Sequence, residues 1–306
     1  MIDEHADAVT FRADAARFAA TLPRALPALP SGTYEVVDVG PAAPVRRLNV
    51  YRPAGPGVPG VFVNLHGGGF VLGSAQDDDP YCRLLADASG CAVVNVDYPL
   101  APEHPYPAAV HQTYDLLAWI AEHGGVLGVD GSRLAVGGHS AGGNLAAACA
   151  LLARRHGRPL LRGVVVDYAP LDLWTPPADK LVGPVRDDPG ATALAEAGAR
   201  FNAWYLPDPA SGADELASPV LASDVSGLPP TLVLTAERDL LRAEGDRYAA
   251  RLSAAGVPTE HAVFPGCGHG FTHVGPEEHA AAAWARMAAF VRRVVGVAAT
   301  SDTVRA

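Results

Sequence analysis

The chain has 306 residues, of which 49% are hydrophobic and 18% charged, so it can bury a large core and is not a disordered or fibrous protein. Its 33 acidic and 23 basic residues give a net charge of −10 at pH 7. An acidic field repels phosphate backbones and anionic lipid headgroups. We therefore expect neither nucleic acid nor a membrane surface as a partner.

The cysteines and the chain ends carry no signal for disulfides, metal binding or membrane insertion. Cys82, Cys91, Cys149 and Cys267 include no CxxC pair and show no metal-ligand spacing. The acidic N-terminus leads into no apolar run, and arginines interrupt the apolar C-terminal stretch. These features predict buried thiols in a soluble, cytoplasmic protein.

Short valine-rich runs alternate with longer alanine- and leucine-rich stretches along most of the chain. This alternation is typical of an α/β fold, in which helices cover both faces of a mostly parallel sheet. Predicted strands cover residues 61–65, 92–96, 134–136, 163–166, 231–234 and 260–264. Predicted helices cover residues 108–122, 141–156, 244–255 and 277–295.

Two regions interrupt this alternation, residues 1–40 and an insertion at about 171–218. The insertion is rich in proline and acidic residues and contains four large aromatic residues, Trp174, Phe201, Trp204 and Tyr205. An insertion at the carboxyl edge of a parallel sheet lies over the crevice where α/β proteins bind ligands. We therefore expect both regions to cap a catalytic domain of residues 41–306, with a frayed terminus as the alternative for residues 1–40.

The strongest local motif is Gly138-His139-Ser140-Ala141-Gly142-Gly143, which lies between a predicted strand and a predicted helix. A sharp turn from strand to helix strains the residue at the bend, and flanking glycines remove side chains that would clash there. This context predicts that Ser140 is a nucleophile projecting from the top of the sheet. A phosphate-binding helix start is the alternative interpretation.

A second glycine-rich segment, His66-Gly67-Gly68-Gly69-Phe70, directly follows the first predicted strand. Consecutive glycines let backbone N–H groups approach a ligand closely, as a developing oxyanion requires. We assign the oxyanion hole to the N–H groups of Gly67, Gly68 and Ala141, and expect His66 to hold the loop in place. A flexible turn is the alternative for this segment.

A serine nucleophile needs a general base, and that base needs an acid to fix its tautomer. His269 lies in a glycine-flanked loop after the last predicted strand, and Asp239 follows the strand before it. The chain order Ser140, Asp239, His269 is the one typical of α/β-hydrolases. His273 is the rival base and Glu237 the rival acid.

Together these motifs resemble the hormone-sensitive-lipase family of esterases, which has the α/β-hydrolase fold. Residues 66–70 match the family's HGGGF loop, and residues 97–108 nearly match its DYRLAPEHPFPA segment. Residues 138–146 correspond to the GDSAGGNLA elbow, Asp239 to the DPL aspartate and residues 269–271 to the HGF ending. The resemblance extends from about residue 61 to the end of the last predicted helix.

The resemblance implies a carboxylic-ester hydrolase that forms an acyl-enzyme on Ser140 and needs no metal or organic cofactor. It further implies small-molecule esters with short or medium acyl chains as substrates, a mobile N-terminal cap, and a homodimer as one open oligomeric state. We expect aromatic residues of the cap to line the pocket, with Phe70, Trp204 and Tyr205 contacting the substrate.

Three residues depart from the family pattern. His139 precedes the nucleophile where the family usually carries aspartate, Pro99 replaces the usual arginine, and Leu240 replaces the usual proline. A histidine at that position also occurs in formamidase-like relatives, so amidase, lactonase and acyl-transferase activities stay open as alternatives. A non-hydrolytic ligand-binding protein is a further alternative, although such relatives typically lose a member of the triad.

Overall fold

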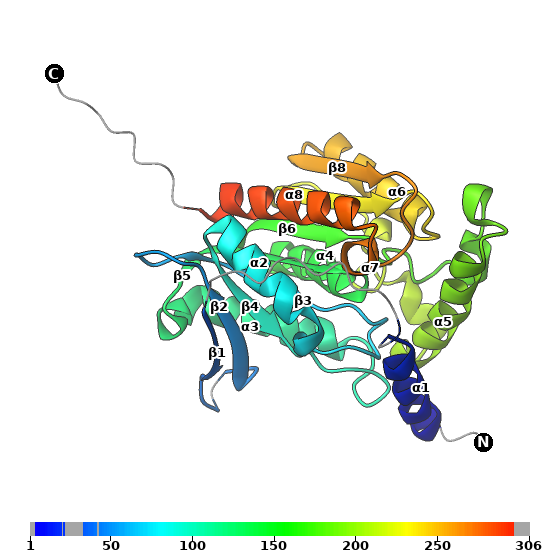
Figure 1. Ribbon diagram of the computed structural model, residues 1–306, viewed down its shortest axis with the longest axis horizontal. Coiled ribbons are helices and arrows are strands. Elements are labelled where there is room, and N and C mark those ends of the chain that lie inside the picture. Colours follow the sequence, from blue (N-terminus) through cyan, green and yellow to red (C-terminus); the bar gives the residue numbers. More distant parts are fainter. Residues whose placement is uncertain (1–3, 20, 22–32, 42, 297–306) are drawn as a thin grey trace.

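A single eight-stranded sheet runs through the described part of the molecule, with helices on both of its faces (Figure 1). The computed structural model describes residues 4–19, 21, 33–41 and 43–296. The strands lie in the order β1-β2-β4-β3-β5-β6-β7-β8. β1 and β2 pair antiparallel to their neighbours, and all other pairs are parallel. The expected α/β fold with a mostly parallel sheet is therefore confirmed.

The six predicted strands all form. The strands are β1 (Thr33–Asp38), β2 (Arg47–Arg52), β3 (Gly60–Leu65), β4 (Ala92–Val96), β5 (Asp130–His139), β6 (Leu161–Asp167), β7 (Thr231–Ala236) and β8 (Thr259–Phe264). The sequence did not predict β1 and β2. β1 is exposed at five of its six positions, so it lacks the apolar run that marks a buried strand.

The helices form two layers and a cap. They are α1 (Glu4–Ala19), α2 (Asp79–Ser89), α3 (Ala108–His123), α4 (Ala141–Arg155), α5 (Pro189–Tyr205), α6 (Arg242–Ala254), α7 (Phe271–Val274) and α8 (Glu277–Val295). α3, α4 and α6 pack in one core cluster, while α2 and α8 pack in another. The four predicted helices form within two residues of their expected ends.

Alternate residues of the central strands divide between these two core clusters. Val61 and Val63 of β3 face the layer with α3 and α4, whereas Phe62 faces the layer with α2 and α8. Successive strand side chains point to opposite faces of a sheet, so a strand buried on both sides reads as a continuous apolar run. This explains why the central strands could be predicted from short valine-rich runs.

The cap combines α1 with the connection between β6 and β7, which contains α5. The two helices lie side by side (Figure 1), and the rings of Phe11 and Phe201 meet edge to face at 5.6 Å. The expected N-terminal cap of residues 1–40 needs one correction, because Thr33–Asp38 forms the edge strand β1 of the sheet. Of that segment, residues 1–3, 20 and 22–32 lie outside the described part of the chain.

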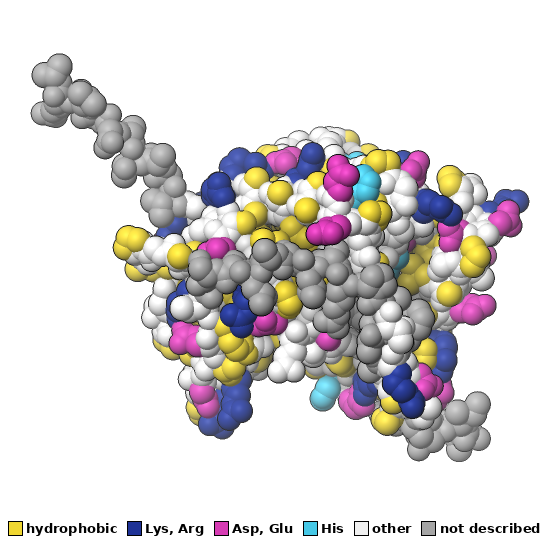
Figure 2. Space-filling model, in the orientation of Figure 1, with side chains coloured by type: hydrophobic (Ala, Val, Ile, Leu, Met, Phe, Trp, Pro, Cys, Tyr) yellow, Lys and Arg dark blue, Asp and Glu magenta, His cyan; other side chains and the backbone are white. Residues whose placement is uncertain are grey.

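The surface mixes charges of both signs, which are interspersed over the face shown in Figure 2. All four cysteines are buried and unpaired. None of the described helices is both long enough and apolar enough to cross a lipid bilayer.

Candidate active site

Ser140 occupies a strained turn between β5 and α4. Its φ of 52° and ψ of −121° are unusual for a residue with a side chain, and its N–H donates to Asp167 O at 2.9 Å. A Cβ atom at Gly138 or Gly142 would lie 2.2 Å or 1.9 Å from the backbone oxygen of Leu65. The glycines two residues before and two after Ser140 are therefore required by the neighbouring strand β3, which approaches the turn on this side.

Ser140, His269 and Asp239 come together at the carboxyl edge of the sheet. Ser140 Oγ lies 3.0 Å from His269 Nε2, and His269 Nδ1 lies 2.7 Å from Asp239 Oδ2. Asp239 is buried, and its other oxygen accepts the N–H of Leu241 at 2.9 Å. With the proton on Nδ1 donated to Asp239, the lone pair of Nε2 faces the serine hydroxyl.

The rival residues form other hydrogen bonds. Glu237 accepts the N–H of Gly266 at 2.7 Å. His273 lies 3.0 Å from the hydroxyl of Tyr168 through its Nδ1 atom. Neither is hydrogen-bonded to a member of the Ser140, His269 and Asp239 group in the described structure.

One of the three N–H groups predicted to form the oxyanion hole is not available in the glycine-rich loop after β3. The N–H of Gly67 already donates to His139 Nε2 at 2.9 Å, so it is not free for a substrate oxygen. By contrast, the N–H groups of Gly68, Gly69 and Ala141 have no acceptor among the described residues. Gly68 and Gly69 both adopt positive φ, of 118° and 61°. Sequence alone could not reveal this, because it does not place His139 against the loop.

His66 supports this loop, in line with its expected structural role. Its Nδ1 lies 2.7 Å from Gly67 O, and its ring stacks on Tyr98 with centroids 4.2 Å apart. The hydroxyl of Tyr98 donates to the backbone oxygen of His66 at 2.8 Å. Ala101 adds a bond from its N–H to Phe70 O at 2.9 Å. Residues 97–108 therefore act as scaffold for the loop.

His139, the residue before Ser140, lies between Gly67 and Asp78, with its side chain 12% exposed. Burial lowers the pKa of His139 to about 3, although the nearby Asp78 carboxylate opposes this. The imidazole is therefore neutral at neutral pH, and its Nε2 can accept the N–H of Gly67. In this chain, a neutral ring thus ties the turn at Ser140 to the glycine-rich loop.

A cavity of about 660 Å³ adjoins these residues, between the carboxyl edge of the sheet and the cap. Ser140, His269 and the glycine-rich loop line one side of it. The other side is largely apolar and includes Leu173, Leu194, Phe201, Asn202 and Leu240. A pocket of this size and character is typical of a small-molecule binding site.

The structure places the three residues predicted to contact the substrate differently with respect to the cavity. Phe70 lines the cavity, but Trp204 and Tyr205 do not. Tyr205 is fully buried and stacks on Phe70 at 3.9 Å, and Trp204 packs against Phe11 at 5.3 Å. Of the four aromatic residues of the insertion that were expected at the pocket, Phe201 lines the cavity and Trp174 does not.

Phe201 differs from Trp204 and Tyr205 in lining the cavity, although all three belong to α5. The α5 residues that line the cavity, at positions 194, 198, 201 and 202, are spaced as one face of a helix. No helix is predicted from sequence over residues 189–205, so nothing there distinguishes Phe201 from Trp204 and Tyr205.

The fold is that of an α/β-hydrolase, and comparisons with known proteins agree with this class. Residues 62–273 match the family described by the alpha/beta hydrolase fold. An arylesterase of Saccharolobus solfataricus is 37% identical over 215 residues, which are 69% of this chain and 68% of that protein. The esterase LipI of Mycobacterium tuberculosis is 38% identical over 237 residues, 74% of this chain and 71% of that protein.

A solved structure extends the similarity to nearly the whole chain. The hyperthermophilic esterase from Pyrobaculum calidifontis is 36% identical, with a TM-score of 0.79 over 95% of this chain and 94% of that one. The chain therefore belongs to the α/β-hydrolase family. Its resemblance to the hormone-sensitive-lipase-like esterases, and with it the class of carboxylic-ester hydrolases, is confirmed.

Proposed function

We propose that this chain is a serine carboxylic-ester hydrolase with Ser140 as nucleophile, His269 as general base and Asp239 as the acid that orients the imidazole. One observation carries the proposal, a continuous chain of contacts at 3.0 Å from Ser140 Oγ to His269 and at 2.7 Å from His269 to Asp239. A serine hydroxyl is a weak nucleophile until an adjacent base takes its proton.

The reaction proceeds through an acyl-enzyme. Ser140 Oγ attacks the ester carbonyl while its proton moves to His269 Nε2, which then protonates the leaving alcohol. The Asp239 carboxylate stabilises the imidazolium formed in this step. Water then attacks the acyl group by the same route, with His269 again acting as base, and releases the acid.

The N–H groups of Gly68, Gly69 and Ala141 would stabilise the oxyanion. Gly68 and Ala141 keep their predicted role, and Gly69 takes the place of Gly67, whose N–H donates to His139. None of the three donates to an acceptor within the described chain, so each is available to a substrate oxygen. Donors aimed at a developing negative charge usually make the largest contribution to catalysis of this kind.

We infer that the substrates are small, neutral esters with short or medium acyl chains. The cavity of about 660 Å³ has apolar walls, including Leu173, Leu194 and Phe201, that can take up an acyl chain. The net charge of −10 also disfavours anionic substrates. His139 gives no particular support to amide cleavage, because its imidazole is engaged by the N–H of Gly67.

A fluorophosphonate probe tests the nucleophile. The wild type should be labelled once, at Ser140, and the Ser140→Ala variant should not be labelled. Ser253→Ala, at an exposed serine of α6, is the matched control and should label like the wild type. Labelling that persists in Ser140→Ala, or none in the wild type, would refute the proposal.

A substrate panel tests the reaction. We expect 4-nitrophenyl butanoate and hexanoate to be cleaved faster than the dodecanoate, an aryl formamide or a lactone at equal concentration. Faster turnover of the amide or lactone would favour the amidase or lactonase alternatives. Tight binding without turnover would favour a non-hydrolytic protein, and product esters formed from added alcohol would favour an acyl transferase.

A further inference from the structure

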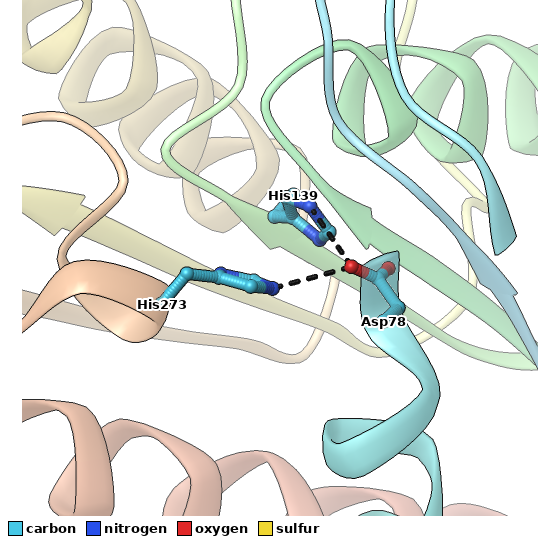
Figure 3. A group of neighbouring side chains, drawn as sticks. All are labelled: Asp78, His139 and His273. Atoms are coloured by element: carbon cyan, nitrogen blue, oxygen red, sulfur yellow. Dashed lines mark ion pairs between the residues drawn. The ribbon is translucent and has the colours of Figure 1, made fainter. Parts of the chain in front are cut away.

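Beside the cavity, a buried carboxylate faces two imidazoles that the proposed reaction does not use. Figure 3 shows the side chains of His139, from the end of β5, and His273, from α7, pointing toward Asp78 at the end of the 3₁₀ helix η1 (Ala75–Asp78). Asp78 Oδ1 lies 3.5 Å from His139 Nε2 and 3.3 Å from His273 Nε2. These three atoms all lie within 4.8 Å of one another.

The atoms of this group that face one another are ones that can bind a metal ion. His139 Nε2 accepts the N–H of Gly67, so it carries a lone pair rather than a proton, and it lies 3.5 Å from Asp78 Oδ1. His273 Nδ1 has two hydroxyls within reach, at 2.9 Å and 3.0 Å, whereas its buried Nε2 has no hydrogen-bond partner in the described structure. Asp78 Oδ2 accepts from Asn64, which leaves Oδ1 for the two imidazoles.

The charge of Asp78 is compensated only by groups without a permanent positive charge among the described residues, namely Asn64 and the imidazoles. Asp78 is only 2% exposed, and no lysine or arginine of the described residues forms an ion pair with it. A buried carboxylate is costly unless a cation or several donors compensate it. A bound cation would satisfy Asp78 Oδ1 and the unpartnered Nε2 of His273 together.

We propose that Asp78, His139 and His273 form a binding site for a divalent transition-metal ion of the zinc class. Two imidazoles and one carboxylate are a ligand set that suits Zn²⁺ and its neighbours better than Mg²⁺ or Ca²⁺. Bonds of the usual zinc length place tetrahedral ligands about 3.3 Å apart. The distances from Asp78 Oδ1 to His273 Nε2 and to His139 Nε2, 3.3 Å and 3.5 Å, are close to this value.

The site is accessible and is linked to the glycine-rich loop. All three residues line the cavity of about 660 Å³, through which an ion can enter and a water molecule can complete the coordination. Metal bound at His139 Nε2 would take the lone pair that now accepts the N–H of Gly67. Occupancy therefore releases the N–H of Gly67 and alters the loop beside Ser140.

Direct binding tests the proposal independently of ester hydrolysis. The purified chain, stripped of metal by a chelator, should bind one equivalent of Zn²⁺ in a calorimetric titration. Binding of Mg²⁺ should be at least 100-fold weaker. Co²⁺ in the same site should give the strong visible absorption of a tetrahedral complex, and the amide resonance of Gly67 should shift as Zn²⁺ is added.

Substitutions distinguish Zn²⁺ binding at this cluster from Zn²⁺ binding at surface histidines. His273→Asn and Asp78→Asn should each weaken Zn²⁺ binding at least tenfold. His111→Ala, at an exposed histidine of α3, is the matched control and should bind like the wild type. If both cluster variants fail to fold, the proposal is tested by the stoichiometry of Zn²⁺ binding to the wild type and by its Co²⁺ spectrum. No stoichiometric binding to the wild type, an octahedral Co²⁺ spectrum, or undiminished binding in a folded cluster variant would overturn the proposal.

Discussion

The carboxyl edge of the sheet and the cap above it are built from different kinds of contact. At the sheet edge, the backbone itself sets the geometry: the N–H of Ser140 is bonded to Asp167 O, and Gly142 has no room for a Cβ atom next to Leu65 O. Such positions tolerate almost no change, because the neighbouring strand cannot move without disrupting the sheet.

The cap is held by side chains. Arg200 of α5 forms an exposed ion pair with Asp7 of α1 at 3.1 Å, and its guanidinium lies 4.4 Å from the ring centre of Phe11. Arg12 donates to Val71 O at 2.9 Å and pairs with Glu103. Contacts of this kind can change one at a time without unfolding the domain. Backbone contacts therefore fix the surroundings of Ser140, whereas side-chain contacts hold the cap in place.

The largest effect should come from Asp239→Asn at the sheet edge. The substitution keeps the side-chain shape, but an amide can hold the wrong imidazole tautomer, so we expect kcat to fall by about 10⁴, equivalent to about 5.5 kcal/mol in the activation barrier. Steady-state kinetics with a short-chain ester would measure this. The control Glu237→Gln should keep kcat within about twofold. A large loss in the control with little loss in Asp239→Asn would instead make Glu237 the acid.

The next effect concerns the base of the cap, where a buried ion pair joins it to the sheet domain. Glu244 of α6 pairs with Lys180 at 2.7 Å and accepts the N–H of Leu171 at 3.0 Å. Burial raises the pKa of Glu244 from 4.5 to about 7, although Lys180 partly opposes this. The folded chain therefore holds this proton over a pH range in which the unfolded chain has lost it.

The sign of the stability change follows from this difference. The contribution of Glu244 is complete below pH 4.5 and is lost as pH rises toward and through 7, so this group alone should lower stability by no more than about 3 kcal/mol between pH 5 and pH 8. His139, whose pKa is lowered in the folded chain, acts in the opposite direction in both the wild type and the Glu244→Gln variant, so the Glu244 effect is the difference between them. Glu244→Gln should remove most of this slope in urea unfolding at the two pH values. Glu277→Gln, at an exposed site on α8, should retain it. An unchanged slope in Glu244→Gln would show that another group is responsible.

The sheet edge could be predicted from sequence because its constraints are local. Gly138 and Gly142 flank Ser140 in the chain, and their role depends only on the turn from strand to helix. Asp239 and His269 follow apolar runs, and parallel strands bring their carboxyl ends to one edge. The predicted positions therefore needed no knowledge of side-chain packing.

The remaining features depend on contacts between distant segments. The N–H of Gly67 is taken by His139, 72 residues later, and no local pattern indicates that bond. The cluster of Asp78, His139 and His273 likewise joins three separate segments, so its members show no metal-ligand spacing in the sequence. The positions of Trp204 and Tyr205 could not be predicted for a different reason, because they depend on α5, which is not predicted from sequence.

Phe201 should control substrate choice without affecting the chemistry. Its ring lies directly over Gly69, where a Cβ atom would be 2.2 Å from Phe201 Cδ2, and it lines the cavity. The substitution Phe201→Ala removes the ring and should raise KM for a hexanoate ester about tenfold. An apolar contact of this size is worth about 1.5–3 kcal/mol when fully buried. The kcat value for the acetate should change little. Trp174→Ala, at an aromatic residue of the same insertion that is 55% exposed, is the control and should leave both constants unchanged. A large fall in kcat for the acetate would mean that the cap helps to position the reacting groups.

The smallest effect should come from Arg200→Ala, which removes the ion pair between α1 and α5. Exposed ion pairs are worth about 0–1 kcal/mol and the stacking of Arg200 on Phe11 adds about 0.5–1 kcal/mol, so overall stability should fall by about 1 kcal/mol or less. Urea unfolding at low salt would measure this loss of stability, and the difference from wild type should shrink at high salt as the ion pair is screened.

Arg17→Ala, whose partner Asp14 lies in the same helix, is the control and should leave the docking of α1 intact. Limited proteolysis should therefore cut within α1 faster in Arg200→Ala than in Arg17→Ala. Equal rates would mean that the rings of Phe11, Phe201 and Trp204 hold α1 without the ion pair, and that the cap is anchored more like the sheet than its exposed contacts suggest.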